Sequence, residues 1–342
     1  MNTKSNTTAP LRQPAEWDRH SAVWSAWPSA ADLWLEDLEP ARAEVAALFK
    51  AIADGGKGEM LKIVANGDEA VASARAALKG ENAEIIPGMF GDIWFRDIAP
   101  IFVKGPAGLQ ASCFQFNGWG GKYVLEGDDQ VAAFVAKQAG TPALVNDWVL
   151  EGGSIDVDGL GTALTTRQCL LNENRNPSLS QADIEARLKK GLGIEHLIWL
   201  GDGLANDHTD GHIDNIARFI APGVVVCMEP FGSDDPNTDA LKAIIADLKA
   251  ARDVNGKKLE VMTVPSPGRM ENEDGDVMPV SSMNFYIGNT TVVVPLYGAK
   301  SDDAAVAAIA KLFPGRRTIG LPANSVITGG GSFHCITQQQ PA

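Results

Sequence analysis

The sequence contains no run of eighteen apolar residues, so we expect no transmembrane helix and no membrane partner. Its N-terminus is polar and lacks the apolar core of a secretion signal, and we expect residues 1–10 to be disordered. The four cysteines show neither CxxC nor zinc-type spacing, which argues against a disulfide framework. Together these absences predict a cytoplasmic protein in a reducing compartment.

Positive charge is also scarce, with 29 Lys and Arg against 43 Asp and Glu and a net charge of −14. A nucleic-acid partner requires a basic patch, so none is expected. The acidity suits a small cationic substrate, although acidic surfaces also serve solubility. The hydrophobic content of 45% is typical of a globular protein with a large core. Composition leaves homo-oligomerisation open.

Helical patterns recur at intervals of about sixty residues and predict a repeated α/β fold. They run over 68–79, 128–138, 180–190, 237–251 and 302–312, with an additional helix over 41–53. Short β-rich runs separate them, at 61–65, 84–86, 145–150, 197–200, 224–228, 259–264, 291–295 and 318–320. We therefore expect ββαβ-like units, arranged radially in one closed α/β domain over residues 11–342. An ordinary open α/β sheet is the alternative.

Polar motifs repeat with a similar spacing. Asp97, Glu151, His212 and Cys335 each lie downstream of a helical pattern, with one unit skipped before Cys335. In a radial fold, equivalent positions of successive units converge at the axis. These four residues are therefore expected to meet at one central site.

Cys335 follows three consecutive glycines, Gly329 to Gly331, close to the last residue of the sequence. Glycine lets the backbone pass where a side chain does not fit, and thiol is the most nucleophilic of the common side chains. We interpret Cys335 as a catalytic nucleophile; a small buried hydrophobe is the alternative. If this segment is a strand, His334 points to the opposite face, which favours His212 as the base for Cys335.

His208 and His212 have the i,i+4 spacing of a zinc-binding helix, so a metal site is one interpretation. Gly211 makes a helix poor here, and no Glu follows His208, so no metal is expected. In an extended segment, His212 and Asp214 would project on the same face. A histidine beside a carboxylate suits acid–base chemistry.

Asp97 and Glu151 complete the set of candidate acids. A structural Arg–Asp pair stacked on Trp94 is the alternative reading for the segment 92–100, and a solvated turn is the alternative for Glu151. Three acids around one Cys and one His suit a cation better than a neutral amide. A guanidinium has five N–H donors that two carboxylates can clamp, which would aim its carbon at a thiolate.

Together the motifs resemble the agmatine deiminase family, related to bacterial peptidylarginine deiminases. They are PAEW at 14–17, WSAWP at 24–28, WFRD at 94–97, FNGWGGKY at 116–123, EGGSID at 151–156, TDGHID at 209–214 and the tail at 329–339. The resemblance implies the five-bladed α/β-propeller called the pentein fold. It also implies hydrolysis of agmatine to N-carbamoylputrescine and ammonia, within polyamine biosynthesis, with no metal or organic cofactor.

The resemblance further implies a role for each candidate residue. Cys335 would attack the guanidinium carbon to form a covalent amidino-thioether, while His212 would protonate the departing ammonia and then activate water. Asp97 and Asp214 would clamp the guanidinium nitrogens. The remaining two are Glu151, which would support His212 and the cationic centre, and Trp94, which would pack against the alkyl chain.

Two places depart from the family pattern, Ser332-Phe333 and Ser282, and they put the exact substrate in question. The alternatives are an amidinotransferase, a deiminase of another guanidino compound including peptidyl-arginine, and a guanidine-binding protein without activity. A metallohydrolase ranks last.

Overall fold

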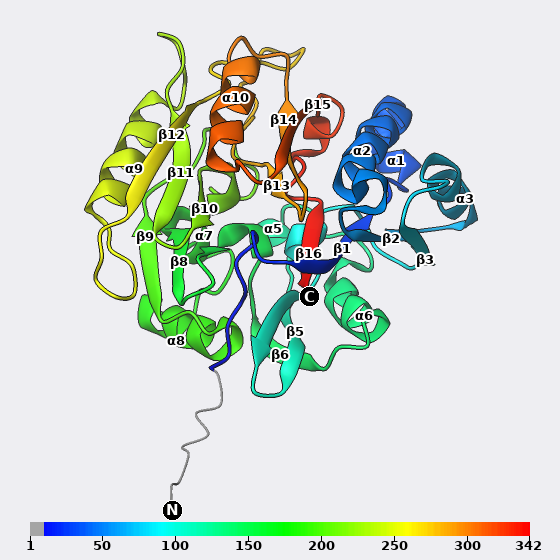
Figure 1. Cartoon of the computed structure of the whole chain (residues 1–342), viewed down its shortest axis with the longest axis horizontal. Helices are drawn as coiled ribbons and strands as arrows, with labels where there is room; N and C mark the ends of the chain where they lie inside the picture. The colour runs from blue at the N-terminus through cyan, green and yellow to red at the C-terminus, as the bar shows by residue number, and fades with distance from the viewer. Residues whose placement is uncertain (1–9) are drawn as a thin grey trace, which may run out of the picture.

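In the computed structural model, which describes residues 10–342, five small β-sheets lie around a common centre (Figure 1). The predicted disordered start at 1–10 falls, except for Pro10, outside the described residues, and the single domain over 11–342 stays a prediction. No helix within residues 10–342 is long and apolar enough to cross a membrane.

Four sheets have the predicted ββαβ order, in which an antiparallel pair is followed by a helix and a parallel strand. Their strands are β4 (Ile101–Gly105), β5 (Gly108–Gln115) and β6 (Ala143–Val149); β7 (Asp156–Val157), β8 (Thr162–Thr166) and β9 (His196–Leu200); β10 (Ala217–Ala221), β11 (Val224–Glu229) and β12 (Glu260–Pro265); β13 (Tyr286–Ile287), β14 (Thr291–Leu296) and β15 (Arg317–Pro322). Their helices are α6 (Val131–Gln138), α8 (Gln181–Leu192), α9 (Thr238–Ala250) and α10 (Asp302–Leu312).

The fifth sheet joins the two ends of the described chain, in the order β16-β1-β2-β3. Strand β16 (Thr337–Pro341) runs antiparallel to β1 (His20–Ala26), which is parallel to β2 (Met60–Ala65), and β3 (Ala83–Pro87) completes the sheet. The strand directly after Cys335 is therefore paired rather than frayed, unlike most chain ends.

The position of the first repeat was predicted wrongly. Helix α2 (Leu38–Ala53) connects β1 to β2 and is the ββαβ helix of the first sheet, whereas α3 (Asp68–Ala77) connects β2 to the added strand β3. The sequence pattern had counted α3 as the first repeat and α2 as the addition. The spacing of a helix along the sequence does not indicate whether its sheet contains three strands or four.

The predicted helices and strands are all present, and local chemistry explains their ends. Helix α8 begins with a capping box, in which the Ser180 hydroxyl accepts from the Asp183 N–H and the Asp183 carboxylate accepts from the Ser180 N–H. It ends at Gly193 in the left-handed conformation (φ 73°). The strands without a prediction were β1, β4, β5, β7, β8, β10, β13 and β16, several of which are too short to show a pattern.

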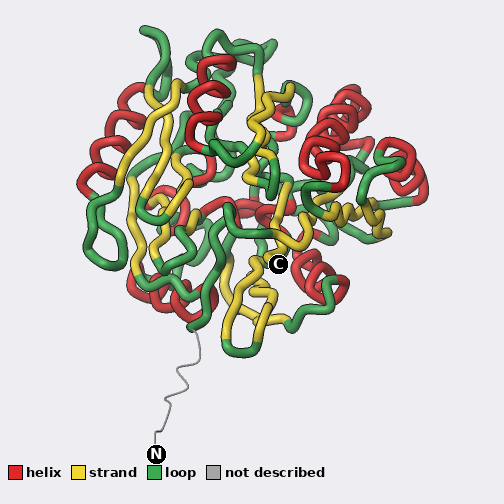
Figure 2. Tube along the Cα trace, viewed as in Figure 1, coloured by secondary structure: helices red, strands yellow, loops and turns green. Residues whose placement is uncertain are grey.

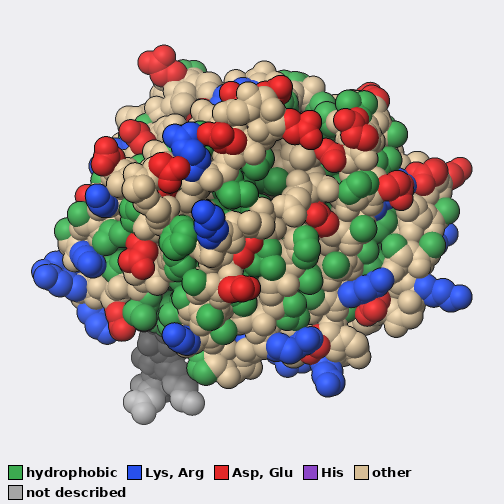
Figure 3. All heavy atoms as spheres, turned by 90° about the horizontal axis from the view of Figure 1, so that it is seen from above, with side chains coloured by type: hydrophobic (Ala, Val, Ile, Leu, Met, Phe, Trp, Pro, Cys, Tyr) green, Lys and Arg blue, Asp and Glu red, His purple; other side chains and the backbone are tan. Residues whose placement is uncertain are grey.

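The central strands form the core of each sheet. In β14, five of six residues are buried, as expected for a strand covered on both faces. The long helices lie toward the outside of the ring (Figure 2). On the face shown in Figure 3, Lys and Arg side chains are scattered among Asp and Glu rather than gathered in a stripe.

Short helices and turns occupy many connections, and several of them shape the site. They are α1 (Ala31–Trp34), η1 (Leu35–Asp37), η2 (Asp54–Gly56), α4 (Phe95–Ile98), α5 (Gly118–Gly121), η3 (Asp128–Gln130), η4 (Gly152–Ser154), α7 (Arg167–Leu170), η5 (Ile213–Asn215) and η6 (Ile327–Gly329).

Candidate active site

All five connections between neighbouring sheets contribute to one site. In chain order they carry Asp97 between β3 and β4, Glu151 between β6 and β7, His212 and Asp214 between β9 and β10, Asn284 between β12 and β13, and Cys335 between β15 and β16. The unit that the sequence pattern skipped therefore also contributes, through Asn284. Equivalent positions of the five units converge, as the radial arrangement predicts.

Cys335 lines a cavity of about 290 Å³ and is 4% exposed. Its Sγ lies 3.1 Å from Asn284 Nδ2 and 3.7 Å from Asp214 Oδ2. The pKa of Cys335 lies well above its usual value because the thiol is buried and because the Asp214 and Asp97 carboxylates disfavour a thiolate. The Asn284 amide acts in the opposite direction. These surroundings therefore favour the protonated thiol in the free protein.

Arg96 holds the chain at Cys335. Its backbone N–H donates to the Cys335 carbonyl at 3.0 Å, and its Nε donates to the His334 carbonyl at 3.3 Å. The carboxylate nearest its guanidinium is that of Glu16, at 3.7 Å. Among the described residues Arg96 makes no ion pair with Asp97, so the alternative of a structural pair between them is wrong.

The glycines before Cys335 are required by two indole rings. A Cβ at position 329 would lie 2.8 Å from the Trp94 ring and 2.9 Å from the Trp34 ring. A Cβ at position 331 would lie 2.5 Å from the Trp94 ring. Real Cβ contacts are longer than this, so Gly329 and Gly331 let the backbone pass directly against the tryptophans.

Gly153 plays the same part on the opposite side of the site. Its N–H donates to Asp97 Oδ1 at 2.8 Å. A Cβ there would lie 2.6 Å from His212 Nδ1, 2.9 Å from Asp97 Oδ1 and 3.1 Å from Asp214 Oδ2. Three candidate side chains therefore converge on the space that this glycine leaves. His212 and Asp214 meet through the short turn η5 rather than an extended segment.

The charges of this group are strongly coupled. His212 is fully buried, with Nδ1 3.8 Å from Asp97 Oδ1. Burial lowers the pKa of His212, but the Asp97 carboxylate, together with Cys169 and Glu151, outweighs it and holds that pKa well above its usual value. Burial is the largest cause of the raised pKa of Asp97. The site therefore favours an imidazolium between carboxylates.

His334 is placed differently from the prediction. Residues 333–336 form a turn rather than a strand. His334 Nδ1 lies 2.7 Å from Asp214 Oδ2, the same oxygen that Cys335 Sγ approaches, while Nε2 lies 2.8 Å from Glu16 Oε2. Burial would raise the pKa of Asp214, but its hydrogen bond with His334 and the nearby His212 and Arg218 lower that pKa overall. His334 therefore positions Asp214 and has neither ring nitrogen free to act as a base.

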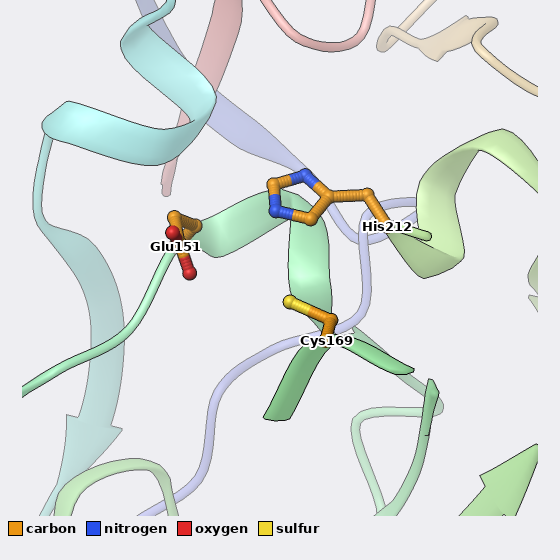
Figure 4. A group of neighbouring side chains, drawn as sticks. All are labelled: Glu151, Cys169 and His212. Atoms are coloured by element: carbon orange, nitrogen blue, oxygen red, sulfur yellow. The ribbon is translucent and has the colours of Figure 1, made fainter. Parts of the chain in front are cut away.

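Glu151 is fully buried rather than part of a solvated turn, so that alternative is wrong. Its Oε1 accepts from Arg175 Nε at 2.6 Å. Figure 4 shows Glu151 and Cys169 directed toward the His212 ring from two further segments of chain. No sequence pattern pointed to Cys169, which is buried in α7.

Aromatic rings wall the cavity, and Trp94 is among them. Asp92 ties two of these rings together, because its Oδ1 accepts from Trp34 Nε1 at 2.9 Å and its Oδ2 accepts from Trp94 Nε1 at 2.7 Å. Burial outweighs these hydrogen bonds and raises the pKa of Asp92 to about 6. On the other side, Asp97 Oδ2 accepts from Trp119 Nε1 at 2.9 Å.

The charge of the cavity lining has one sign. Besides Asp92 and Asp97, it includes the acids Glu36 and Asp37, and no Lys or Arg is among the described residues that line it. The departures from the family pattern lie outside the lining; they are Ser282, Ser332 and Phe333.

The metal-helix alternative for His208 and His212 is excluded by the local structure. Residues 205–212 form turns, not a helix. His208 stacks on Tyr123 beside the cavity, whereas His212 is fully buried. The two rings do not share a helical face.

Sequence reasoning missed Asn284, Cys169, Trp119 and Asp92. Asn284 could have been found by asking what the skipped unit contributes, since it lies in the fourth connection. Asp92 and Trp119 lie in motifs that were noted for other residues. Cys169 carries no signal in the sequence, because only the fold brings α7 beneath His212.

Comparison with known proteins agrees with this geometry. Residues 12–341 match the family described as Porphyromonas-type peptidyl-arginine deiminase. The agmatine deiminase of Stutzerimonas stutzeri is 38% identical over 353 residues, covering 96% of this chain and 95% of that one. A solved agmatine deiminase of Enterococcus faecalis superposes with a TM-score of 0.90 at 32% identity, covering 97% and 96% of the two chains.

A more distant solved structure shares the fold alone. It is DDAH from Pseudomonas aeruginosa, with a TM-score of 0.53 at 10% identity, covering 94% of this chain and 99% of that one. These similarities confirm the predicted five-bladed α/β-propeller, the pentein fold, and exclude the open sheet.

Proposed function

The chain belongs to the Porphyromonas-type peptidyl-arginine deiminase family, and on this premise we propose that it is an agmatine deiminase. This C–N hydrolase converts agmatine and water to N-carbamoylputrescine and ammonia. One observation carries the proposal beyond the family: the cavity ends at a buried thiol flanked by two carboxylates and has no cationic side chain in its described lining.

Binding of the guanidinium is the first step. Asp214 Oδ1 is buried and has no hydrogen-bond partner among residues 10–342, so it is available to accept from a guanidinium N–H. Each Asp97 oxygen accepts one hydrogen bond from the protein and retains a second lone pair. The two carboxylates thus clamp the planar cation beside Cys335.

The bound cation also activates the nucleophile. It offsets the negative charges of Asp214 and Asp97, which hold the pKa of Cys335 up, so the thiol loses its proton to solvent. The thiolate, which accepts from Asn284 Nδ2, then forms an S–C bond to the guanidinium carbon. The C–N bond breaks, and ammonia leaves with a proton from the His212 imidazolium.

Water completes the turnover. Neutral His212 takes a proton from water, the hydroxyl oxygen bonds to the amidino carbon, and the C–S bond breaks to return the thiolate. The remaining hydroxyl proton leaves to solvent as the carbonyl of N-carbamoylputrescine forms. Glu151, close to the His212 ring, favours the imidazolium that each proton transfer needs. No step requires a metal or an organic cofactor.

The cavity lining supports agmatine over free arginine. Agmatine carries an ammonium at its far end, and Glu36 and Asp37 are the charged side chains of η1 that line the cavity. The α-carboxylate of arginine would meet those acids with no counter-charge in the lining. Trp34 and Trp94 provide apolar surface for the tetramethylene chain between the two cations.

One assay tests this proposal. We expect ammonia release from agmatine without an amine acceptor, much slower release from arginine and peptidyl-arginine, and none from N-carbamoylputrescine. Activity should survive exhaustive chelation. Dependence on an added amine would instead assign an amidinotransferase, and preference for peptidyl-arginine would assign the other activity named for the family.

We further propose that the enzyme acts in the cytoplasm and supplies N-carbamoylputrescine for putrescine synthesis.

A further inference from the structure

Three metal-ligand side chains meet on the buried side of His212. One donor atom from each of Glu151, Cys169 and His212 lies within 4.8 Å of the other two (Figure 4). Each comes from a different connection or helix, and all three side chains are fully buried. Only Glu151 and His212 have roles in the proposed reaction.

Three polar atoms of this cluster make no hydrogen bond in the described part of the chain. Glu151 Oε2 and both ring nitrogens of His212 are buried and have no hydrogen-bond partner among residues 10–342. The other Glu151 oxygen accepts from Arg175 Nε, which fixes the carboxylate. Buried polar atoms are normally satisfied, so unpartnered atoms from two side chains at one point indicate a ligand.

We propose that Glu151, Cys169 and His212 form an inhibitory site for a thiophilic divalent cation of the zinc class. Thiolate, imidazole and carboxylate are the ligands that Zn²⁺ takes, and three protein ligands leave a fourth position for water. The donors need to close to about 3.5 Å from one another for tetrahedral coordination, which is a small movement from their present positions.

Charge balance supports such a site in a dry interior. Metal ligands must be deprotonated, so the cation displaces the Cys169 thiol proton and one proton of the His212 imidazolium, and both leave to solvent. Two protons leave the cluster and one divalent cation enters, so its net charge does not change. The cluster therefore holds the metal without an added buried charge, which would otherwise be costly.

The cluster lies close to the cavity. Asp97 and Thr209 both line the cavity. Asp97 borders the Nδ1 side of His212, and the Thr209 carbonyl accepts from Arg175 Nη2. The cluster is thus one layer of side chains below the cavity. A metal on the ring would prevent His212 from giving or taking a proton, so binding would block turnover; this consequence rests on the proposed function.

Binding is tested with Co²⁺ as the spectroscopic probe. The background is Cys335→Ala, which removes the thiol that lines the cavity and leaves the cluster intact. We expect about one equivalent of Co²⁺ with a near-ultraviolet thiolate-to-cobalt band. Adding Cys169→Ser should remove the band and weaken binding at least tenfold. Adding Cys227→Ser, a matched change of a buried thiol in β11, should alter neither.

A second substitution covers the case in which Cys169→Ser unfolds the protein, as judged by circular dichroism. Glu151→Gln keeps the thiol and the ring, and in the same background it should weaken Co²⁺ binding at least tenfold. The site is overturned by a band that persists without Cys169, by unchanged affinity in Glu151→Gln, or by absence of Co²⁺ binding in Cys335→Ala.

Inhibition by the metal is tested with the active protein. Zn²⁺ should stop ammonia release by the wild type, and EDTA should restore it. In Cys169→Ser, measured relative to that variant's own activity, the inhibitory midpoint should rise at least tenfold; an unchanged midpoint would refute inhibition through this cluster. Because the Co²⁺ titration uses an inactive variant, it tests the site even if the proposed deiminase activity is wrong.

Discussion

Two parts of the site differ in what they require of their residues. The catalytic floor is charged, buried and assembled from the connections between sheets; it consists of Asp97, Glu151, His212, Asp214 and Cys335. The aromatic wall is largely apolar and shaped by close packing; it consists of Trp34, Trp94, Asp92, Gly329 and Gly331.

This difference separates the residues that take part in the reaction from those that shape the binding site. Floor side chains either transfer protons and form bonds or stabilise the charges that develop in the reaction, so their alteration should act mainly on kcat. Wall side chains contact the unreacting part of the substrate equally before and during the reaction, so their alteration should act mainly on KM. The predictions below test whether a substitution has the effect expected for its part of the site.

The largest effect is expected for Cys335→Ser. A hydroxyl is a far weaker nucleophile than a thiolate, so kcat for ammonia release should fall by at least about 1,000-fold while agmatine still binds. Calorimetric titration with agmatine and an ammonia assay measure the two quantities. Cys227→Ser is the control and should retain activity. Near-normal turnover by Cys335→Ser would exclude the covalent mechanism.

Asp97→Asn tests the electrostatics of the floor. It removes a carboxylate that raises the pKa of Cys335, so that pKa should fall and the thiolate should appear at lower pH. The rate of alkylation at Cys335, followed by peptide mass spectrometry across pH, reports the shift. Turnover should also fall by about 100-fold, because one clamp on the guanidinium is lost.

The control for Asp97→Asn is Asp129→Asn, an exposed acid that should leave the alkylation profile unchanged. If the Cys335 profile stays the same in Asp97→Asn, the Asp97 charge does not act on the thiol as the geometry requires.

Gly153→Ala tests the shape of the floor. The added Cβ would lie 2.6 Å from His212 Nδ1, so the ring must move and kcat should fall by about 100-fold through misplacement. Gly201→Ala is the matched control, since nothing lies within 4 Å of a Cβ there. Steady-state kinetics measure kcat for both variants. Equal values would show that the close approach of Gly153 to His212 is not needed.

Gly329→Ala tests the aromatic wall. Its Cβ would press on the rings of Trp34 and Trp94, so KM for agmatine should rise by about tenfold with kcat within about threefold. Gly315→Ala, which has open space, serves as control. A loss confined to kcat would break the distinction between floor and wall.

The smallest effect concerns the pH dependence of stability. The pKa of Asp92 is raised to about 6 in the folded protein, so the folded state binds this proton more tightly than the unfolded chain. That contribution is complete below the ordinary carboxyl pKa of about 4 and is lost as pH rises through about 6. Asp92→Asn should therefore flatten the fall in melting temperature over this window.

Calorimetry at several pH values measures this effect, with Asp129→Asn as the exposed control. An unchanged profile in Asp92→Asn would mean that the wall does not hold a protonated carboxyl. Asp128, whose pKa is also raised to about 6 by burial, should continue to contribute in the same range.

Sequence reasoning reached much of the site because the important side chains fall in distinctive local patterns. Cys335 after three glycines, the Glu151-Gly-Gly turn and the His212-Ile-Asp214 segment are short and unusual. It failed where spatial neighbours decide a role. His334 is adjacent to Cys335 in the chain, yet only the turn at 333–336 and the nearby Glu16 make it a support for Asp214.

By itself, the sequence determined the ββαβ repeat, the candidate nucleophile and its acids, and the cationic preference that an excess of carboxylates implies. The tertiary structure alone decided that α2 rather than α3 begins the repeat, that Asn284 contacts the thiol, and that Cys169 lies beneath His212. Local patterns follow from neighbouring residues. Contacts between the five connections follow only from closing the ring through β16 and β1.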